Sequence, residues 1–204
     1  EMLERTPGFM PRITEIIHGT TLVINAIIER KGAQTGLITT RGFRDVLELG
    51  RELRYDAYDI FAEYPLPLVP RSLRHEVAER VTSDGRVIQA LEETEARQVL
   101  KGLLDLGVES LAVCLINAYE NPVHEKLIKR VVSHDAPALS LSTSFEVLPQ
   151  IREYERTCTT ATNAYVKPIT AQYLAKLSAR LESLGFTGKL FIMLSSFFKC
   201  FCKF

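Results

Sequence analysis

The sequence contains no apolar run long enough to cross a bilayer and no excess of charge of either sign. Its longest apolar stretch is Leu111–Ile116, whereas a transmembrane helix needs about 20 consecutive apolar residues. Twenty-five basic and twenty-five acidic side chains cancel, and no basic patch with interleaved aromatic residues is present. The N-terminal residues also lack the apolar core of a signal peptide. We therefore expect no nucleic-acid or membrane partner and, by default, a cytoplasmic location.

Cysteine and histidine are few, and their spacing matches neither a metal site nor a disulfide framework. The four cysteines are Cys114, Cys158, Cys200 and Cys202, and the four histidines are His18, His75, His124 and His134. We expect the cysteines to be free thiols. No two histidines have the i, i+4 spacing of a helical zinc site, and His124-Glu125 alone is not a metalloprotease signature. No metal site built from protein ligands alone is expected.

What the chain does contain is enough apolar sequence for a buried core, with 46% hydrophobic residues in 204. The periodicity of these residues predicts an α/β protein, a mixed sheet with flanking helices. Residues 74–90 read as a hairpin around Asp84-Gly85. Strands are expected near residues 12–17, 36–40, 77–81, 86–89, 110–117, 139–143 and 189–194, and helices near 20–31, 42–50, 93–106, 122–133 and 147–184, with a break at Pro168.

Polar side chains gather at one end of a strand–helix–strand–helix unit between residues 18 and 51. The segment His18–Thr21 follows the first strand, where glycine allows a sharp turn and a threonine can cap the next helix. Thr39–Arg41 follows the second strand, at the carboxyl edge where open α/β sheets form ligand crevices. Helix N-termini with hydroxyl groups and an arginine would attract a phosphate or a carboxylate. The residues alone also allow these threonines to be caps and the histidine to be structural.

Two further polar segments are open to a structural or a functional interpretation. Asn117 and His124 flank the junction between an apolar strand and a helix that begins near Pro122, so they either meet a ligand or serve local capping and packing. Arg152 and Arg156 lie four residues apart in a charged helical stretch. Taken alone, that stretch predicts a solvated face whose ion pairs contribute about a few tenths of a kcal/mol each.

The order of these segments resembles the hydantoinase A and 5-oxoprolinase family, in the N-terminal region of its ATP-dependent subunit. The first segment carries His-Gly-Thr-Thr, Asn-Ala, Glu-Arg-Lys-Gly-Ala and Thr-Thr-Arg-Gly-Phe-Arg-Asp in the family's order. Residues 118–125 resemble its strand-to-helix junction. Residues 146–157 match Glu-Val-x-Pro-x-x-Arg-Glu-Tyr-Glu-Arg-Thr, and Asn-Ala-Tyr follows at 163–165. Gln150 and Cys158 stand where the family pattern has glutamate and serine.

The resemblance implies a fold that is part of an actin-like, ribonuclease-H-like ATPase. It implies an enzyme that uses ATP and Mg²⁺ to phosphorylate the carbonyl of a cyclic amide, of the 5-oxoproline or hydantoin type, which water then opens. It also implies a hydantoinase B-type subunit as partner. The same family includes ATP-dependent ketone carboxylase subunits, and the sequence leaves that alternative open. A third alternative is a catalytically inert fragment that serves as a scaffold.

The two ends depart from the family pattern. The family's opening phosphate loop is absent, and a phenylalanine-rich tail stands where Ser-x-Gly-Gly is expected. We therefore expect an internal fragment that is inactive in isolation. Its predicted parts are the hydantoinase/oxoprolinase N-terminal region without its first phosphate loop at 1–187, the start of the following hydantoinase A domain at 188–196, and an aberrant tail at 197–204. A truncation or frameshift artefact would explain the tail, with a genuine terminus as the alternative.

The resemblance also assigns binding roles, although it does not identify catalytic residues. We expect the segment His18–Thr21 and Asn25 to line a nucleotide or substrate cleft, and Arg41 and Asp45 to support it. The candidates are His18, Gly19, Thr20, Thr21, Asn25, Thr40, Arg41, Asp45, Arg152, Glu153, Arg156 and Asn163. Hydroxyl and guanidinium groups are thus predicted to converge at one edge of a sheet around an anion.

Overall fold

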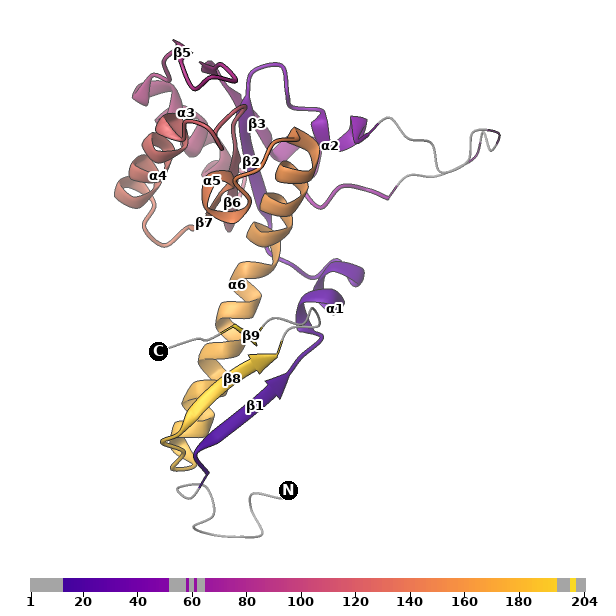
Figure 1. Cartoon of the computed structure of the whole chain (residues 1–204), viewed down its shortest axis with the longest axis vertical. Helices are drawn as coiled ribbons and strands as arrows, with labels where there is room; N and C mark the ends of the chain where they lie inside the picture. Colours follow the sequence, from indigo (N-terminus) through magenta and orange to yellow (C-terminus); the bar gives the residue numbers. More distant parts are fainter. Residues whose placement is uncertain (1–12, 52–57, 59–60, 62–64, 194–198, 201–204) are drawn as a thin grey trace. The chain divides into compact units, whose positions relative to one another are not determined.

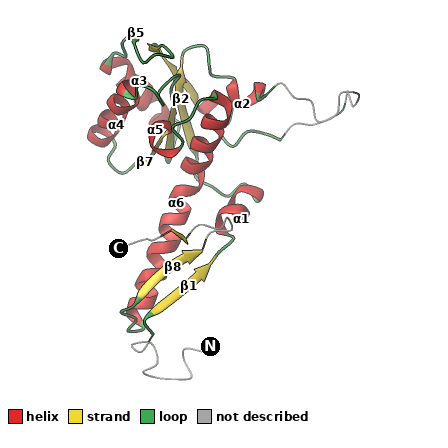
Figure 2. Cartoon of the chain, in the orientation of Figure 1, coloured by secondary structure: helices red, strands yellow, loops and turns green. Residues whose placement is uncertain are grey.

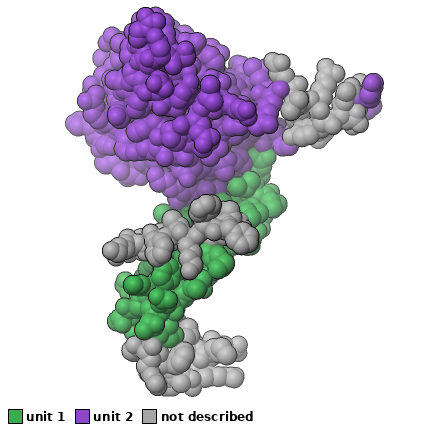
Figure 3. Space-filling model, in the orientation of Figure 1, with its two compact units in different colours: residues 1–31, 169–204 green, residues 32–168 purple. Residues whose placement is uncertain are grey.

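The computed structural model describes residues 13–51, 58, 61, 65–193 and 199–200, and it shows two compact units (Figure 1). Unit 1 comprises residues 1–31 and 169–204, and unit 2 comprises residues 32–168 (Figure 3). The predicted aberrant tail lies outside the described residues, except for Lys199–Cys200. The boundaries predicted at residues 187 and 196 stay predictions, because the two units reflect compactness rather than family relationship.

Unit 2 is built around a four-stranded parallel sheet with the strand order β3-β2-β6-β7. Its strands are β2 (Thr35–Thr40), β3 (Arg74–Val77), β6 (Ser110–Cys114) and β7 (Ser140–Thr143). Every residue of the two central strands, β2 and β6, is buried. Complete burial is expected of a parallel sheet that is covered on both faces.

Helices cover both faces of this sheet, so the α/β prediction is confirmed. Figure 2 shows α3 (Glu93–Asp105) and α4 (Val123–Asp135) on one side and the beginning of α6 (Glu153–Ser183) on the other. The core includes Leu37, Ile38, Leu100, Leu103, Leu111, Val113, Ile128, Val131 and Ala164. Full burial of a leucine, isoleucine or valine side chain contributes about 1.5–3 kcal/mol. Within the described part of the chain, no helix is long and apolar enough to cross a bilayer.

Helix α6 continues through Pro168, where the sequence predicted a break. Proline lacks the N–H that would bond the carbonyl of Ala164, and a buried carbonyl without a partner costs about 1–3 kcal/mol. The Ser110 hydroxyl donates to that carbonyl at 2.7 Å from 54 residues away in the sequence. The break was wrongly predicted because a strand residue replaces the missing helical donor. The helix also begins later than predicted, and the separate short helix α5 (Ser144–Val147) precedes it.

The hairpin predicted over residues 74–90 was wrong in its first half. Arg74–Val77 forms β3, which pairs in parallel with β2, so no strand extends over residues 77–81. The hairpin itself consists of β4 (Arg80–Val81) and β5 (Val87–Gln89). Its Asp84-Gly85 turn is confirmed, with Gly85 at φ 81°. Local turn chemistry identified the turn, but β3 before it pairs with β2, which lies far earlier in the chain.

Unit 1 contains a small sheet made from distant parts of the sequence. Strand β1 (Glu15–Gly19) pairs in parallel with β8 (Lys189–Met193), and β8 pairs antiparallel with β9 (Lys199–Cys200). Among its described residues, the core cluster of this unit has two buried members, Leu181 and Phe186. Ile13, Ile16, Leu177, Leu184 and Leu190 pack against them. In the described part of the chain, the apolar core of unit 1 is therefore smaller than that of unit 2.

Three elements near the predicted site differ from their predicted bounds. The first strand was predicted at 12–17 but lies at 15–19, so its last two residues are the histidine and glycine of His18–Thr21. Helix α1 (Leu22–Ile28) and helix α2 (Val46–Leu49) are both shorter than predicted. Gly42 has φ 91°, which no helix accommodates, so α2 cannot begin before this turn has ended. The two helices have seven and four residues, and the predicted attraction of an anion by their N-termini stays a prediction.

Candidate functional site

The carboxyl ends of β2 and β6 lie side by side in unit 2, as predicted, and a buried polar network occupies this edge. The hydroxyl of Thr40 accepts a hydrogen bond from Ile116 N–H at 2.9 Å and donates to a carboxylate oxygen of Glu79. The other oxygen of Glu79 lies 2.6 Å from Nδ1 of His124. Thr40, Glu79 and His124 are only 1%, 2% and 5% exposed. Protein groups therefore already engage the Thr40 hydroxyl.

Arg156 is fully buried, which corrects the prediction that it lies on a solvated helix face. Its Nη2 donates to the Leu115 carbonyl at 2.8 Å, and its Nη1 donates to the Gln150 carbonyl at 3.1 Å. The guanidinium also lies 5.3 Å from the centre of the Tyr119 ring. It therefore ties the beginning of α6 to the end of β6. A buried charge of this kind depends on such partners to remain in the core.

Arg152, four residues earlier, has a different environment. It precedes α6, has φ 82°, and its side chain is 72% exposed with Glu155 3.9 Å away. Glu153 is the first residue of α6 and is half-buried. Asn163, one of the predicted binding residues, donates from Nδ2 to the Ser142 hydroxyl at 2.9 Å. The two arginines of one motif thus have opposite exposure.

Arg41 and Asp45 lie in ion pairs at the surface of unit 2. Arg41 Nη2 is 3.1 Å from a carboxylate oxygen of Glu95. Asp45 receives two hydrogen bonds from the guanidinium of Arg71, at 2.7 and 3.0 Å. These bonds lower the pKa of Asp45. Exposed pairs of this kind contribute little to stability.

Asn117 and His124 both make internal contacts. Asn117 has φ 55°, and its Nδ2 donates to the Val81 carbonyl at 2.8 Å, which ties the end of β6 to the β4–β5 hairpin. His124 contacts Glu79 in the buried polar network. These contacts are the capping and packing that the sequence left open as one of two alternatives.

Sequence analysis missed Glu125, a fully buried carboxylate on α4. It accepts hydrogen bonds from Leu115 N–H at 2.9 Å, from the Ser144 hydroxyl at 2.7 Å and from Phe145 N–H at 3.0 Å. Burial raises its pKa to about 7, although these donors favour the charged form. Its spacing of three residues from the buried Ile128 was the signal that could have placed it on the inner face of α4.

In unit 1, the polar side chains of His18, Thr20 and Thr21 lie next to the exposed main chain of Gly19. His18 Nε2 lies 2.6 Å from the hydroxyl of Tyr173. The Thr20 hydroxyl accepts from Leu22 N–H at 3.1 Å, whereas Thr21, the N-cap residue of α1, makes no side-chain capping hydrogen bond. The Thr21 hydroxyl accepts from the Asn25 amide at 3.4 Å. Gly19 is exposed, and among the described residues other than its chain neighbours no heavy atom lies within 4 Å of the point where a Cβ on Gly19 would stand.

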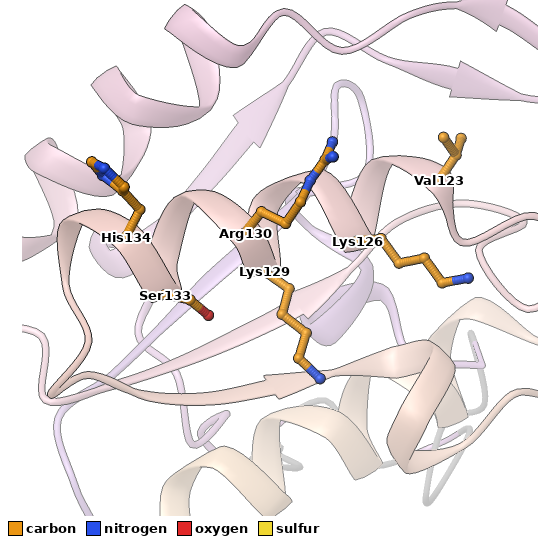
Figure 4. A pocket seen from close by; sticks show the side chains of 6 residues that line it. All are labelled: Val123, Lys126, Lys129, Arg130, Ser133 and His134. Atoms are coloured by element: carbon orange, nitrogen blue, oxygen red, sulfur yellow. The ribbon is translucent and has the colours of Figure 1, made fainter.

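A separate hollow on the outer side of α4 contains none of the predicted binding residues. Its lining consists of Val123, Lys126, Lys129, Arg130, Ser133 and His134 (Figure 4). Lys129 is paired with Glu146, and Lys126 lies 5.8 Å from the centre of the Phe145 ring. Among the described residues, no group of three or more histidine, cysteine, aspartate and glutamate side chains could hold a metal ion.

Comparison with known proteins gives similarity along most of the chain. The family described as the hydantoinase/oxoprolinase N-terminal region matches residues 2–135. The caprolactamase subunit alpha of Pseudomonas jessenii is 35% identical over 91% of this chain and 27% of its own length. The 5-oxoprolinase 1 of Arabidopsis thaliana is 30% identical over 89% of this chain and 16% of its own length. The chain thus spans about a quarter or less of the length of these relatives.

Solved structures show the same relationship. The crystal structure of the ATP-dependent caprolactamase from Pseudomonas jessenii matches with a TM-score of 0.86 and 32% identity, over 91% of this chain and 27% of that one. The nucleotide-free structure of an acetone carboxylase, from work on ATP-dependent acetone carboxylation, matches with a TM-score of 0.77 and 27% identity, over 90% and 28% of the two chains. The likeness is consistent with the predicted actin-like ATPase fold.

Proposed function

Because the chain belongs to the hydantoinase/oxoprolinase N-terminal region family, we propose that it forms part of an ATP-dependent enzyme that opens a cyclic amide. The observation that carries this proposal is the likeness to the ATP-dependent caprolactamase, with a TM-score of 0.86 over 91% of the chain. A ring amide is too inert for direct attack by water. ATP would transfer its γ-phosphoryl group to the carbonyl oxygen and leave as ADP. Water would then attack the activated carbon, the ring C–N bond would break, and inorganic phosphate would be released from the resulting carboxyl group.

The segment His18–Thr21 supports a role in binding the nucleotide. Its main chain is open at Gly19, and the hydroxyls of Thr20 and Thr21 lie on the residues that follow. Hydroxyls, main-chain amides and an imidazole N–H all donate hydrogen bonds to phosphate oxygens. Donors fixed in advance also stabilise the charge that develops on a transferred phosphoryl group. We therefore assign a nucleotide phosphate to this segment.

The proposed binding residues of unit 2 divide by exposure. Arg41, Asp45 and Arg152 have exposed side chains in ion pairs that a charged ligand can replace. Thr40 and Arg156 are buried and hydrogen-bonded to protein groups. We therefore assign them a structural role, in which they stabilise the edge of the sheet. Glu153 and Asn163, both half-buried, stay proposed binding residues.

The alternative is an ATP-dependent ketone carboxylase subunit, in which the activated group would be bicarbonate. The likeness to acetone carboxylase supports it, but both the TM-score, 0.77, and the identity, 27%, are lower than for caprolactamase. A cyclic amide is therefore the favoured substrate class. Mg²⁺ with the nucleotide, a hydantoinase B-type partner subunit and a cytoplasmic location belong to the same proposal.

Calorimetric titration of the 204-residue chain with Mg-ATP tests the nucleotide part of the proposal. We expect saturable binding that the variant His18→Gln weakens, because this change alters the donor at the assigned phosphate site. The variant Lys101→Gln, on an exposed position of α3, is the matched control and should bind as the wild type does. No heat at millimolar Mg-ATP would contradict nucleotide binding and favour the inert scaffold.

A chimera tests the substrate class. The segment of the caprolactamase subunit alpha that aligns over 188 residues is replaced by the corresponding residues of this chain. ATP-dependent opening of a lactam, 5-oxoproline or a hydantoin would support the proposal. ATP-dependent carboxylation of acetone with bicarbonate, without ring opening, would support the carboxylase alternative.

A further inference from the structure

His18 and Tyr173 form a hydrogen-bonded pair within unit 1 although they are 155 residues apart in the sequence. The Tyr173 hydroxyl lies 2.6 Å from His18 Nε2. The two ring centroids are 5.8 Å apart, and the ring planes are inclined by 31°. Both side chains are half-buried. A contact this short holds the imidazole in one orientation.

The packing of unit 1 determines the position of this pair. Ile16 and His18 are two residues apart on β1 and are the partly buried positions of the strand. Tyr173, Leu177 and Leu181 follow at spacings of four residues, which places them on one face of α6. Ile16 packs in the same core as Leu177 and Leu181. The histidine and tyrosine therefore extend the contact between α6 and β1 beyond its apolar residues.

The hydrogen bond determines which ring nitrogen carries the proton. A neutral imidazole has one N–H, at either Nδ1 or Nε2, whereas a tyrosine hydroxyl has a single O–H to donate. Among the described residues, His18 is the hydrogen-bond partner of the Tyr173 hydroxyl. If Nε2 carried the proton, the tyrosine O–H would lose this acceptor, and a half-buried donor without a partner is unfavourable. The arrangement that satisfies both groups within the protein is the one in which the tyrosine donates to Nε2 and the histidine proton resides on Nδ1.

We propose that Tyr173 is a positioning residue that keeps the His18 proton on Nδ1, so that this N–H can donate to an anionic oxygen bound at His18–Thr21. The inference rests on the proposed function for its ligand, the phosphate of a nucleotide. Tyr173 itself does not need to touch that ligand. Neutral histidine binds an oxyanion as a donor only if the nitrogen facing the oxyanion is the protonated one. Fixing the tautomer in advance thus removes a competing, non-binding state.

The first test is the tautomer of His18 in the wild-type chain, measured by long-range ¹H–¹⁵N correlation spectra of the histidine rings at a pH where they are neutral. His18 is assigned by the loss of its signals in His18→Gln. We expect a proton on Nδ1 and a bare Nε2. A proton on Nε2 overturns the proposal, and this result does not depend on any tyrosine variant folding.

The second test is Tyr173→Phe, which removes the hydroxyl and keeps the ring. We expect His18 to populate both tautomers and the affinity for Mg-ATP to fall by about twofold or more, because the apparent affinity scales with the fraction of the binding-competent tautomer. Tyr165→Phe is the matched control, since it makes the same change elsewhere on α6 and should alter neither quantity. Unchanged tautomer and affinity in Tyr173→Phe would overturn the proposal. If the wild type gives no heat with Mg-ATP, the proposed function fails, whereas a changed tautomer would still support the positioning role.

Discussion

The two units use the same types of polar residue in opposite ways. In unit 2, a threonine, a histidine and an arginine of the predicted motifs, Thr40, His124 and Arg156, are buried and bonded to other protein groups. In unit 1, the histidine and threonines of His18–Thr21 are half-buried or exposed, beside an open glycine. A polar group inside a large core must be satisfied by the protein itself, whereas one beside a small core can still meet a ligand.

This difference shows that residue type and motif alone do not determine the role of a residue. Its role also depends on how deeply its side chain is buried. Substitutions of the buried residues Thr40, His124 and Arg156 in unit 2 should act mainly on folding. Substitutions at His18–Thr21 should act mainly on binding.

The largest effect is expected for Arg156→Met, which keeps the length of the side chain but removes its donors. The carbonyls of Leu115 and Gln150 would lose their charged partner. We expect the free energy of unfolding to fall by about 3 kcal/mol or more. Urea denaturation of both proteins, followed by circular dichroism, measures this difference.

Arg152→Met makes the same chemical change at a side chain that is 72% exposed. We expect it to alter the free energy of unfolding by no more than about 0.5 kcal/mol. Equal losses in the two variants would contradict the contrast between the buried and the exposed arginine.

Glu125 should make the stability of unit 2 depend on pH near neutrality. Burial raises its pKa from the ordinary 4.5 to about 7, so the folded state holds the proton more tightly than the unfolded chain does. Its contribution to stability is fully present below the ordinary value and is lost as the pH rises through about 7. The total change is on the order of 3 kcal/mol, from about 1.4 kcal/mol per pKa unit.

Urea unfolding of the wild type and of Glu125→Gln, from about pH 5 to about pH 8.5, isolates this contribution. We expect the stability of the wild type relative to the variant to decrease toward high pH. Burial lowers the pKa of His75, which has the opposite effect on stability, but this titration is common to both proteins and cancels in the difference. Parallel curves would mean that Glu125 is ionised throughout.

A smaller effect is expected where the sheet of unit 2 supports α6. Ser110→Ala removes the donor to the Ala164 carbonyl and should lower the free energy of unfolding by about 1–2 kcal/mol. In a Pro168→Ala background, the new main-chain N–H can bond that carbonyl, so the same serine substitution should cost less. The double-mutant cycle measures this coupling. Strictly additive losses would show that Ser110 does not replace the donor that proline lacks.

The sequence was sufficient for features that depend on near neighbours in the chain. The alternation of apolar segments with helical periods predicted the α/β fold, and Asp84-Gly85 predicted the turn of the hairpin. The partner of β3 could not be predicted, because Arg74–Val77 reads equally well as the first half of a hairpin. Its pairing with β2 depends on burying Val77 in a sheet formed by distant segments.

The candidate site was predictable to the same extent. Residue types predicted a site at His18–Thr21, which stays a prediction, but they could not show that Tyr173 would reach His18 from 155 residues away. Spacing placed Arg152 and Arg156 on one helix face, but α6 begins only at Glu153 and carries the second arginine into the core. In each case the missing information was a contact between segments far apart in the sequence, which local patterns do not contain.

The smallest effect on stability is expected at Thr21 in unit 1. This residue also gives the sharpest test of whether unit 1 uses its polar side chains for binding and unit 2 uses them for folding. Its side chain is exposed, and its hydroxyl accepts a long hydrogen bond of 3.4 Å from Asn25. Thr21→Ala should therefore change the free energy of unfolding by less than about 0.5 kcal/mol. Calorimetry should nevertheless show weaker binding of Mg-ATP, because a donor to the phosphate is lost. Thr21→Ser keeps the hydroxyl and should bind as the wild type does. A loss of stability in Thr21→Ala with unchanged binding would show that unit 1, like unit 2, uses its hydroxyl groups for folding.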